Sequence, residues 1–597
     1  MSADKSRPAA APLTASRWLG GWAFGGLAAI FVLVSLASSR HQVSTVEMNR
    51  NDAACYMILA RNIAQRGVYS LEQAEPFHPH TEWPPGIPLL YVPPMAIVGE
   101  FPLDASDTAV IHAWSLLLAV LSLWMVWRYL KEMTSPIGAL CATAAVASTK
   151  AFLDSANAAT ADAVAVGFAF LALREIEVYF RDKTPSRSGE AVEQTARLSV
   201  GRKKKAKKTT VRKSPTAPKI AKPRRLRAVG LHVLLACLPI VKPYLGLVFV
   251  AYLWKLLETR PQWRQRLLGT VAIGACCLPF VGFMAFSVIA AERQGTISAV
   301  TWLTTDNPTA VLEGVASTDQ KTLGEWLRGG LRTIRFFLLD NVSEAGVPAL
   351  RWFGFSDWPR VARFGTLALV FGTLACGLVR AVRQKQIAGV GYSTAMFAFF
   401  VVFACDSPRY FTVLTPMCAL YFWNGLTELL AMFGSRSART VVGRALVPVS
   451  EKKEGQACSP FDPQAVATGF VLSVAVIAAG SWVEHRFSER VDPELFYREV
   501  YAALRAAQVD ESIHAIAVPY QLRSVATVET SKPVLSWDEC VSSQRHQWSR
   551  TAVLVIEQDS TGRFTRPLPT ELAGVGSDAE RLIAGRHVRL RIHAGRP

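Results

Sequence analysis

Long apolar runs alternate with short polar segments along most of the chain. A helix that crosses a membrane needs about 20 consecutive apolar residues. The pattern predicts eleven such spans, near residues 17–38, 108–130, 136–153, 162–180, 229–241, 244–257, 267–290, 363–380, 388–405, 410–431 and 465–483. The two short segments flank Lys242 and Pro243, so they are either two short spans or one broken helix.

The composition agrees with a membrane protein. The chain has 597 residues, of which 51% are hydrophobic, and a soluble chain of this length would divide into several domains. The expected fold class is therefore a polytopic α-helical membrane protein of about 11 transmembrane helices. Because the first apolar run is long enough to span, we interpret it as an uncleaved anchor rather than a signal peptide.

The net charge of +19 is concentrated in one segment. Between Gly201 and Arg227 there are 13 Lys or Arg residues and no acidic residue. This segment lies between two predicted spans, so the positive-inside rule places it in the cytoplasm. Its Ser, Thr, Pro and Lys content predicts a disordered loop over 182–228. We expect it to contact anionic membrane lipids rather than nucleic acid.

Counting outward from that loop assigns a side to every other segment. Short basic loops then all fall on the inner side, as expected for a multi-pass protein of the plasma (inner) membrane. The predicted order is a cytoplasmic N-terminus 1–16, a transmembrane region 17–431 with outer loops 39–107 and 291–362, a cytoplasmic linker 432–464, a last span 465–483 and an extracytoplasmic segment 484–597.

The C-terminal segment combines helical and strand patterns. Residues 493–507 have a helical pattern, and three short runs are rich in β-prone residues: 513–518, 551–556 and 587–592. This mixture predicts a small extracytoplasmic α/β domain. It contains no catalytic motif that we identify.

The first outer loop has an unusual content. Residues 53–66 favour a helix that Gly67 would end, with Tyr56 and Ile63 on one face. Asp52 stands at the start of that helix, where it either caps the helix or is placed for chemistry. Residues 83–86, Trp-Pro-Pro-Gly, form a stiff turn.

The predicted topology gathers charged residues at the outer ends of the spans. They are Asp52, Asp154, Asp162, Lys242, Asp406 and Arg409. Charges at this depth cost free energy and tend to mark function. Carboxylates facing cations suit a substrate that carries a phosphate and must lose a proton. Two alternatives stay open: Lys242 as a cation that extends to the interface, and Arg409 as the structural partner of Asp406.

Three short segments in this order resemble a known family. They are Asp52 with Tyr56 and the turn 83–88, then Thr160-Ala161-Asp162, then 408–411, Pro-Arg-Tyr-Phe. Together they are similar to GT-C fold membrane glycosyltransferases, in the branch of the bacterial protein O-mannosyltransferases, the lipid A aminoarabinose transferase and the rhizobial lipopolysaccharide core transferases. The resemblance covers roughly residues 15–430. This chain departs from it at Ala53, where the family often has Glu.

The resemblance implies a function and roles for residues. The donor would be a polyprenyl-phosphate sugar, hexosyl or pentosyl, and the sugar would pass with inversion to an acceptor hydroxyl on a glycan, lipid or protein. Asp52 matches the catalytic acid position and would be the general base. Lys242 and Arg409 would contact the phosphate. Asp162, or else Asp154, would orient the acceptor or hold a divalent cation. The remaining expected substrate-binding residues are Tyr56, Glu82 and Tyr410.

The sequence also fits an alternative function, and it contains one segment with metal-binding residue types. A carrier or flippase for a lipid-linked saccharide is the alternative function, since it also needs spans and outer charges. The segment 78–82, His-Pro-His-Thr-Glu, has metal-binding residue types, but its spacing fits no common metal site. The sequence therefore predicts no certain cofactor and leaves a divalent cation open.

Overall fold

The computed structural model describes part of the chain. The described residues are 13–41, 51–72, 77–98, 101–103, 105–181, 221–260, 262–294, 298, 300, 323–336, 358–402, 411–433, 469, 473, 493–511, 513–519, 522–542, 551–556, 572, 583–584 and 588–592. Several predictions concern residues outside these ranges: Arg409, Tyr410, Asp406, most of the basic loop 182–228, nearly all of the linker 432–464 and most of the span 465–483.

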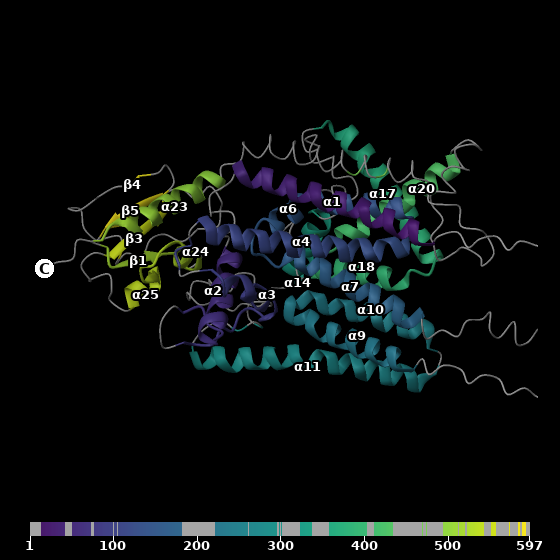
Figure 1. Ribbon diagram of the computed structural model, residues 1–597, viewed down its shortest axis with the longest axis horizontal. Coiled ribbons are helices and arrows are strands. Elements are labelled where there is room, and N and C mark those ends of the chain that lie inside the picture. Colours follow the sequence, from purple (N-terminus) through teal and green to yellow (C-terminus); the bar gives the residue numbers. More distant parts are fainter. Residues whose placement is uncertain are drawn as a thin grey trace, which may run out of the picture.

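A bundle of helices forms the body of the molecule (Figure 1). Its members are α1 (Leu13–His41), α4 (Ala105–Met133), α5 (Pro136–Ala147), α6 (Lys150–Ala156), α7 (Asp162–Arg181), α9 (Ala221–Val241), α10 (Val248–Thr259), α11 (Trp263–Gln294), α14 (Leu323–Phe336), α17 (Arg360–Arg383), α18 (Ile387–Val402) and α20 (Thr415–Phe433). Among the described residues, α4, α11 and α17 are long and apolar enough to cross a membrane by themselves. The chain is accordingly an integral membrane protein.

The first ten predicted spans each fall on described helices. The span 136–153 contains a break, since α5 ends at Ala147 and α6 begins at Lys150. For the eleventh span only Gly469 and Ser473 are described, so the count of eleven stays a prediction.

The segment 229–257 is two helices and not one broken helix. After α9, Lys242 is extended (φ −153°, ψ 130°) and a 3-10 turn, η1 (Pro243–Leu247), leads into α10. The rings of His232 on α9 and Tyr252 on α10 lie 5.9 Å apart, about ten residues on either side of Lys242. The two helices therefore run antiparallel, with Lys242 at the tip of the hairpin.

Close helix contacts hold the bundle together where small residues face one another. A Cβ on Gly377 of α17 would lie 1.7 Å from the Tyr421 carbonyl oxygen of α20, and a Cβ on Gly425 would lie 1.8 Å from that of Thr373. Only glycine permits backbones to approach this closely, as in other packed membrane helices.

A mixed sheet lies at one end of the molecule (Figure 1). Its strands are β1 (Ala515–Val518), β2 (Val534–Ser536), β3 (Thr551–Ile556), β4 (Ile583–Ala584) and β5 (Val588–Ile592), in the order β2-β1-β3-β5-β4. Strand β1 is parallel to β2 and β3, whereas β5 is antiparallel to β3 and β4. Helices α23 (Pro493–Val509), α24 (Arg523–Glu529) and α25 (Trp537–Ser542) accompany it. The helix and three strands expected from the pattern coincide with α23, β1, β3 and β5; the extracytoplasmic location stays a prediction.

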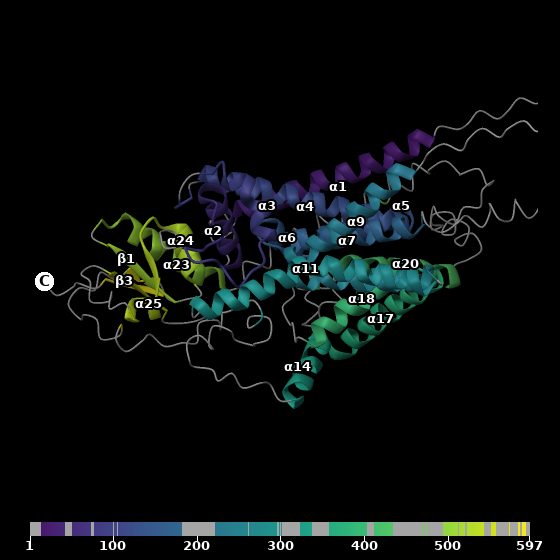
Figure 2. The ribbon, with the colours of Figure 1, turned by 90° about the horizontal axis from the view of Figure 1, so that it is seen from below.

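The sheet unit rests on the helix that carries Asp52. Helix α2 (Asn51–Arg66) packs against α24 and against α3 (Gly86–Met95). Val525 and Val528, each 1% exposed, belong to the same hydrophobic core as the first turns of α2. Figure 2 shows α2 between the sheet unit and the bundle, with α11 extending toward the same end.

Candidate functional site

A buried ion pair joins the beginning of α7 to the tip of the α9–α10 hairpin. The Lys242 ammonium donates to a carboxylate oxygen of Asp162, although 80 residues separate them in the sequence. Their side chains are 14% and 6% exposed. The Lys242 Nζ also lies 5.4 Å from the centre of the Tyr244 ring. Burial of such charges is unfavourable unless each is paired, so this contact explains how both are accommodated.

The start of α7 is capped by another residue, which leaves the Asp162 carboxylate for Lys242. Ser155 Oγ accepts a hydrogen bond from the Ala163 backbone N–H at 2.8 Å and lies 2.6 Å from Thr160 Oγ1. Asp162 is in the first turn of α7, where the helix dipole favours a negative charge. The sequence predicted a role for Asp162 but gave no local signal for Ser155.

The predicted turn at 83–86 lies directly against this hairpin. A Cβ on Gly86 would lie 2.6 Å from the Ile240 carbonyl oxygen and 2.7 Å from the Val241 Cα. Glycine is required here because backbone, and no movable side chain, occupies the space. The turn is thereby fixed beside the residue that precedes Lys242.

Trp83 contacts three residues around the turn. Its indole Nε1 donates to Glu82 at 3.2 Å, and its ring meets Tyr56 of α2 edge-on, with centroids 5.5 Å apart. Its carbonyl accepts from the Tyr69 hydroxyl at 2.6 Å. Burial raises the pKa of Tyr69, and the neighbouring Cys55 raises it further. Two residues predicted to bind substrate, Tyr56 and Glu82, therefore meet at Trp83.

Asp52 lies in the first turn of α2 and is half-buried. Ala53 to Ala60 are all buried, at 0–4% exposed. The first two turns of this helix are therefore buried all round, and not only on the face that carries Tyr56. The reason is packing from two sides, by α3 and by α24.

The other predicted site residues are placed less fully. Asp154 belongs to α6, but its side chain is not among those described. Arg409 and Tyr410 lie outside the described residues. The α18 helix that precedes them contributes Phe400, whose ring centre is 6.0 Å from that of Tyr244. Whether Arg409 pairs with Asp406 stays open.

The two histidines of the segment 78–82 lie in different environments. His78 is 54% exposed, and its Nδ1 lies 2.6 Å from a Glu72 carboxylate oxygen. His80 is buried, and that burial lowers its pKa to about 3. Ser287 of α11 donates to the Thr81 carbonyl at 2.6 Å, which ties this segment to the bundle. Within the described ranges, no group of three or more His, Cys, Asp or Glu side chains is placed to hold a metal ion.

Comparison with known proteins gives likenesses in structure. No protein-family model matches the chain, and no curated protein matches it. A crystal structure of the Archaeoglobus fulgidus oligosaccharyltransferase in the apo form is 12% identical, with a TM-score of 0.47, over 88% of this chain and 69% of that one. ArnT from Cupriavidus metallidurans matches over 95% of this chain and 99% of its own. The apo state is 13% identical with a TM-score of 0.45, and the state bound to undecaprenyl phosphate is 14% identical with a TM-score of 0.49.

These structures are GT-C fold glycosyltransferases, the group that the sequence motifs resemble. Every TM-score lies below 0.5. The chain is thus an integral membrane protein similar to membrane glycosyltransferases, with a buried Asp162–Lys242 pair beside the Trp83–Gly86 turn.

Proposed function

We propose that this protein is a glycosyltransferase that moves a hexosyl or pentosyl unit from a polyprenyl-phosphate donor to an acceptor hydroxyl, with inversion. The reaction would take place at the extracytoplasmic face of the plasma (inner) membrane. The observation that carries the proposal is the buried Asp162–Lys242 pair, held at one end of the bundle beside the Trp83–Gly86 turn. A buried charge pair is costly to maintain and tends to mark a substrate site in a membrane protein.

Lys242 is proposed to contact the donor phosphate. An ammonium has three N–H donors, so it can bind a phosphate oxygen while it keeps its bond to Asp162. The departing lipid phosphate gains negative charge in the transition state, and a cation there lowers the barrier. Arg409 is proposed as the second phosphate contact, on the basis of the Pro-Arg-Tyr-Phe segment alone.

Asp52 is proposed as the general base that accepts the proton of the acceptor hydroxyl. Its position at the start of α2, within the outer loop, supports this role. For Asp162, the contact with Lys242 favours holding the lysine or orienting the acceptor over binding a divalent cation, because the ammonium would repel a metal ion. Tyr56 and Glu82, which meet at Trp83, are proposed to bind the sugar or the acceptor.

The experiment that tests the function uses purified protein reconstituted in vesicles with a polyprenyl-phosphate sugar. We expect free polyprenyl phosphate to accumulate together with a glycosylated acceptor. If the donor crosses the vesicle membrane intact and no lipid phosphate is released, the protein is a carrier and the proposal is wrong. The variant Arg409→Gln should weaken donor binding by about 1.5–3 kcal/mol, the usual contribution of a charged hydrogen bond.

A further inference from the structure

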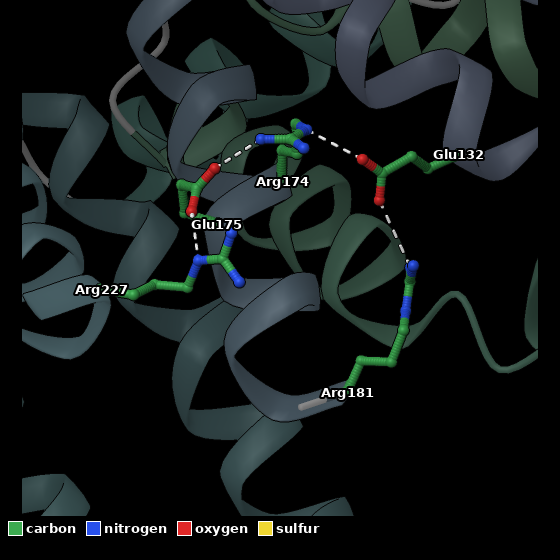
Figure 3. A network of polar contacts seen from close by, with 5 residues as sticks. All are labelled: Glu132, Arg174, Glu175, Arg181 and Arg227. Carbon is green, nitrogen blue, oxygen red and sulfur yellow. Dashed lines mark hydrogen bonds and ion pairs between the residues drawn. The ribbon is translucent and has the colours of Figure 1, made fainter. Parts of the chain in front are cut away.

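A second group of charged residues lies toward the opposite end of α7, beginning at Arg174, about 18 Å along the helix from Asp162 at 1.5 Å per residue. Figure 3 shows five side chains arranged across α7, from Arg227 of α9 on one side to Glu132 of α4 on the other. Arg174 donates to Glu132 at 2.8 Å and to Glu175 at 2.6 Å. Arg181 reaches Glu132 at 3.4 Å, and Arg227 lies 3.8 Å from Glu175.

Arg128 of α4 adds a further cation to this group. The charges of Arg174, Glu132 and Glu175 all act on it. Its guanidinium lies over the ring of Trp124, 5.0 Å from the centroid. Its Nε is buried and has no hydrogen-bond partner within the part of the chain that the structure describes. A buried donor without a partner is unfavourable and indicates a missing acceptor.

The group carries more positive than negative charge. Four arginines face two glutamates, which leaves two positive charges in excess. Beside this group, Lys255 lies 3.2 Å from Glu177 and 3.3 Å from Glu258, and Lys131 adds a positive charge next to Glu132 in the sequence.

The excess charge faces outward. Arg181 and Arg227 are 56% and 45% exposed, whereas Glu132 and Glu175 are 17% and 21% exposed. The contact of Arg181 with Glu132 uses one of the five N–H donors of the guanidinium. An anion that approaches this end therefore meets arginine donors before it meets a carboxylate.

An apolar stripe on α4 leads up to the cations. Leu117, Leu121 and Trp124 are 47%, 41% and 38% exposed. Together with Arg128 they are spaced by four, three and four residues, which places them on one face of the helix. The apolar positions Leu117 to Trp124 span about 10 Å, and the face reaches about 16 Å at Arg128, close to half the ~30 Å hydrocarbon thickness of a bilayer. This is the depth that one acyl chain occupies in one leaflet.

We propose that this end of the molecule is a binding site for an anionic phospholipid. The lipid phosphate accepts hydrogen bonds from Arg128 and Arg181, with Arg227 at its edge, and an acyl chain lies along the stripe Leu117–Leu121–Trp124. The excess positive charge and the buried Nε of Arg128 favour binding of an anion, and the apolar stripe favours contact with an acyl chain. A free phosphate would explain the first feature and leave the second unused.

The test uses delipidated protein in detergent and measures bound lipid by native mass spectrometry. The probes are dioleoylphosphatidylglycerol, dioleoylphosphatidylcholine and the soluble headgroup glycerol 3-phosphate. Each cation near a lipid surface contributes about 1 kcal/mol, or about fivefold. We therefore expect Arg128→Gln/Arg181→Gln to bind phosphatidylglycerol about 25-fold more weakly than the unmodified protein. The matched control is Arg264→Gln, an exposed arginine that also lies over a tryptophan, Trp263; it should bind normally.

A variant that removes a negative charge distinguishes lipid binding from a purely structural role of the network between the helices. Glu132→Gln removes a negative charge, so it should bind phosphatidylglycerol at least as tightly as the unmodified protein. If Glu132→Gln weakens binding as much as the arginine variant does, the network only braces the helices and the proposal is overturned. Equal binding of phosphatidylcholine, or of glycerol 3-phosphate alone, overturns it as well. If the double variant aggregates, the exposed Arg181→Gln alone is measured, with a loss of about fivefold expected and no loss contradicting the proposal.

Discussion

The two ends of α7 both carry ion pairs, but the pairs differ in exposure. At its first residue, Asp162 pairs with Lys242, and both side chains are nearly buried. At its far end, Arg174, Arg181 and Arg227 share two glutamates, and two of these arginines are about half exposed. One helix thus presents a buried pair at one end and a partly solvated network at the other.

This difference in exposure implies different contributions of the two sets of ion pairs to stability. Exposed pairs contribute about 0–1 kcal/mol and are easily tolerated. A buried pair gains little over well-packed apolar residues, yet loss of one partner is strongly destabilising. The Asp162–Lys242 end is therefore expected to be sensitive to substitution and to carry the chemistry. The arginine end is expected to be tolerant and to interact with the membrane.

The largest expected effect concerns Asp52, which we assign to the same end of the molecule as the Asp162–Lys242 pair. Asp52 lies within the first turn of α2, where its charge interacts with the helix dipole by about 0.3–1 kcal/mol, so Asp52→Asn should still fold and express. Asn cannot accept a proton, and general base catalysis contributes roughly 10²–10⁴-fold. Turnover should fall by about that factor while donor binding is retained. A stable Asp52→Asn protein with normal turnover would limit Asp52 to stabilising the first turn of α2 and direct the search to Asp162 and Asp154.

Loss of one partner of the buried pair is the next test. Lys242→Met leaves the Asp162 carboxylate buried without its cation, so the free energy of unfolding should fall by about 3–5 kcal/mol. The double variant Asp162→Asn/Lys242→Met removes the unpaired charge and should recover part of that loss. Denaturation of the purified variants in one detergent measures both. Equal stability of the single and double variants would show that the pair is solvated, and the contrast between the two ends would then disappear.

The stability of the loop that contains His80, near the Asp162–Lys242 pair, is expected to depend on pH. Burial holds the pKa of His80 at about 3, whereas an unfolded histidine titrates near 6.5. The stabilising contribution is therefore complete above about pH 6.5 and decreases as the pH falls toward 3, by about 1.4 kcal/mol per pH unit. Between pH 6.5 and 5 the loop should lose about 2 kcal/mol.

Hydrogen exchange of residues 77–85 at several pH values measures this loss, after correction for intrinsic exchange. His80→Gln is neutral throughout, so the dependence should vanish in that variant. Persistence of the same slope in His80→Gln would assign it to another group.

The smallest effect is expected at the arginine end. Arg181→Gln removes an exposed, long contact to Glu132 at 3.4 Å, so the free energy of unfolding should change by less than about 1 kcal/mol. Turnover with a short-chain donor in detergent should be unchanged. A loss of several kcal/mol at Arg181 would mean that the network is a structural centre of the bundle.

Local patterns in the sequence predicted much of the fold. The apolar runs located ten helices or helix pairs of the bundle, and period and β-propensity located α23, β1, β3 and β5. These elements depend on neighbouring residues, which a sequence displays directly. The hairpin at Lys242 remained undecided, because a Lys-Pro break is compatible with a kink or a reversal. Contact between His232 and Tyr252 resolves it.

The site itself was only partly predictable. Topology placed Asp162 and Lys242 on the same side, but their direct contact joins residues 80 positions apart. No local pattern encodes such a contact. The same applies to Ser287, which binds the Thr81 carbonyl from 206 residues away, and to Val525 and Val528, which bury α2. Long-range packing decides these positions, and a single sequence does not display it.

The most direct test of the central claim is the anomeric configuration of the product. Reconstituted protein is supplied with a polyprenyl-phosphate sugar of known configuration and an acceptor, and the glycosidic linkage is analysed by NMR. A single direct displacement predicts the inverted configuration, one polyprenyl phosphate released per sugar transferred, and loss of both in Asp52→Asn. A retained configuration, or recovery of intact donor with no glycosidic product, would contradict the account.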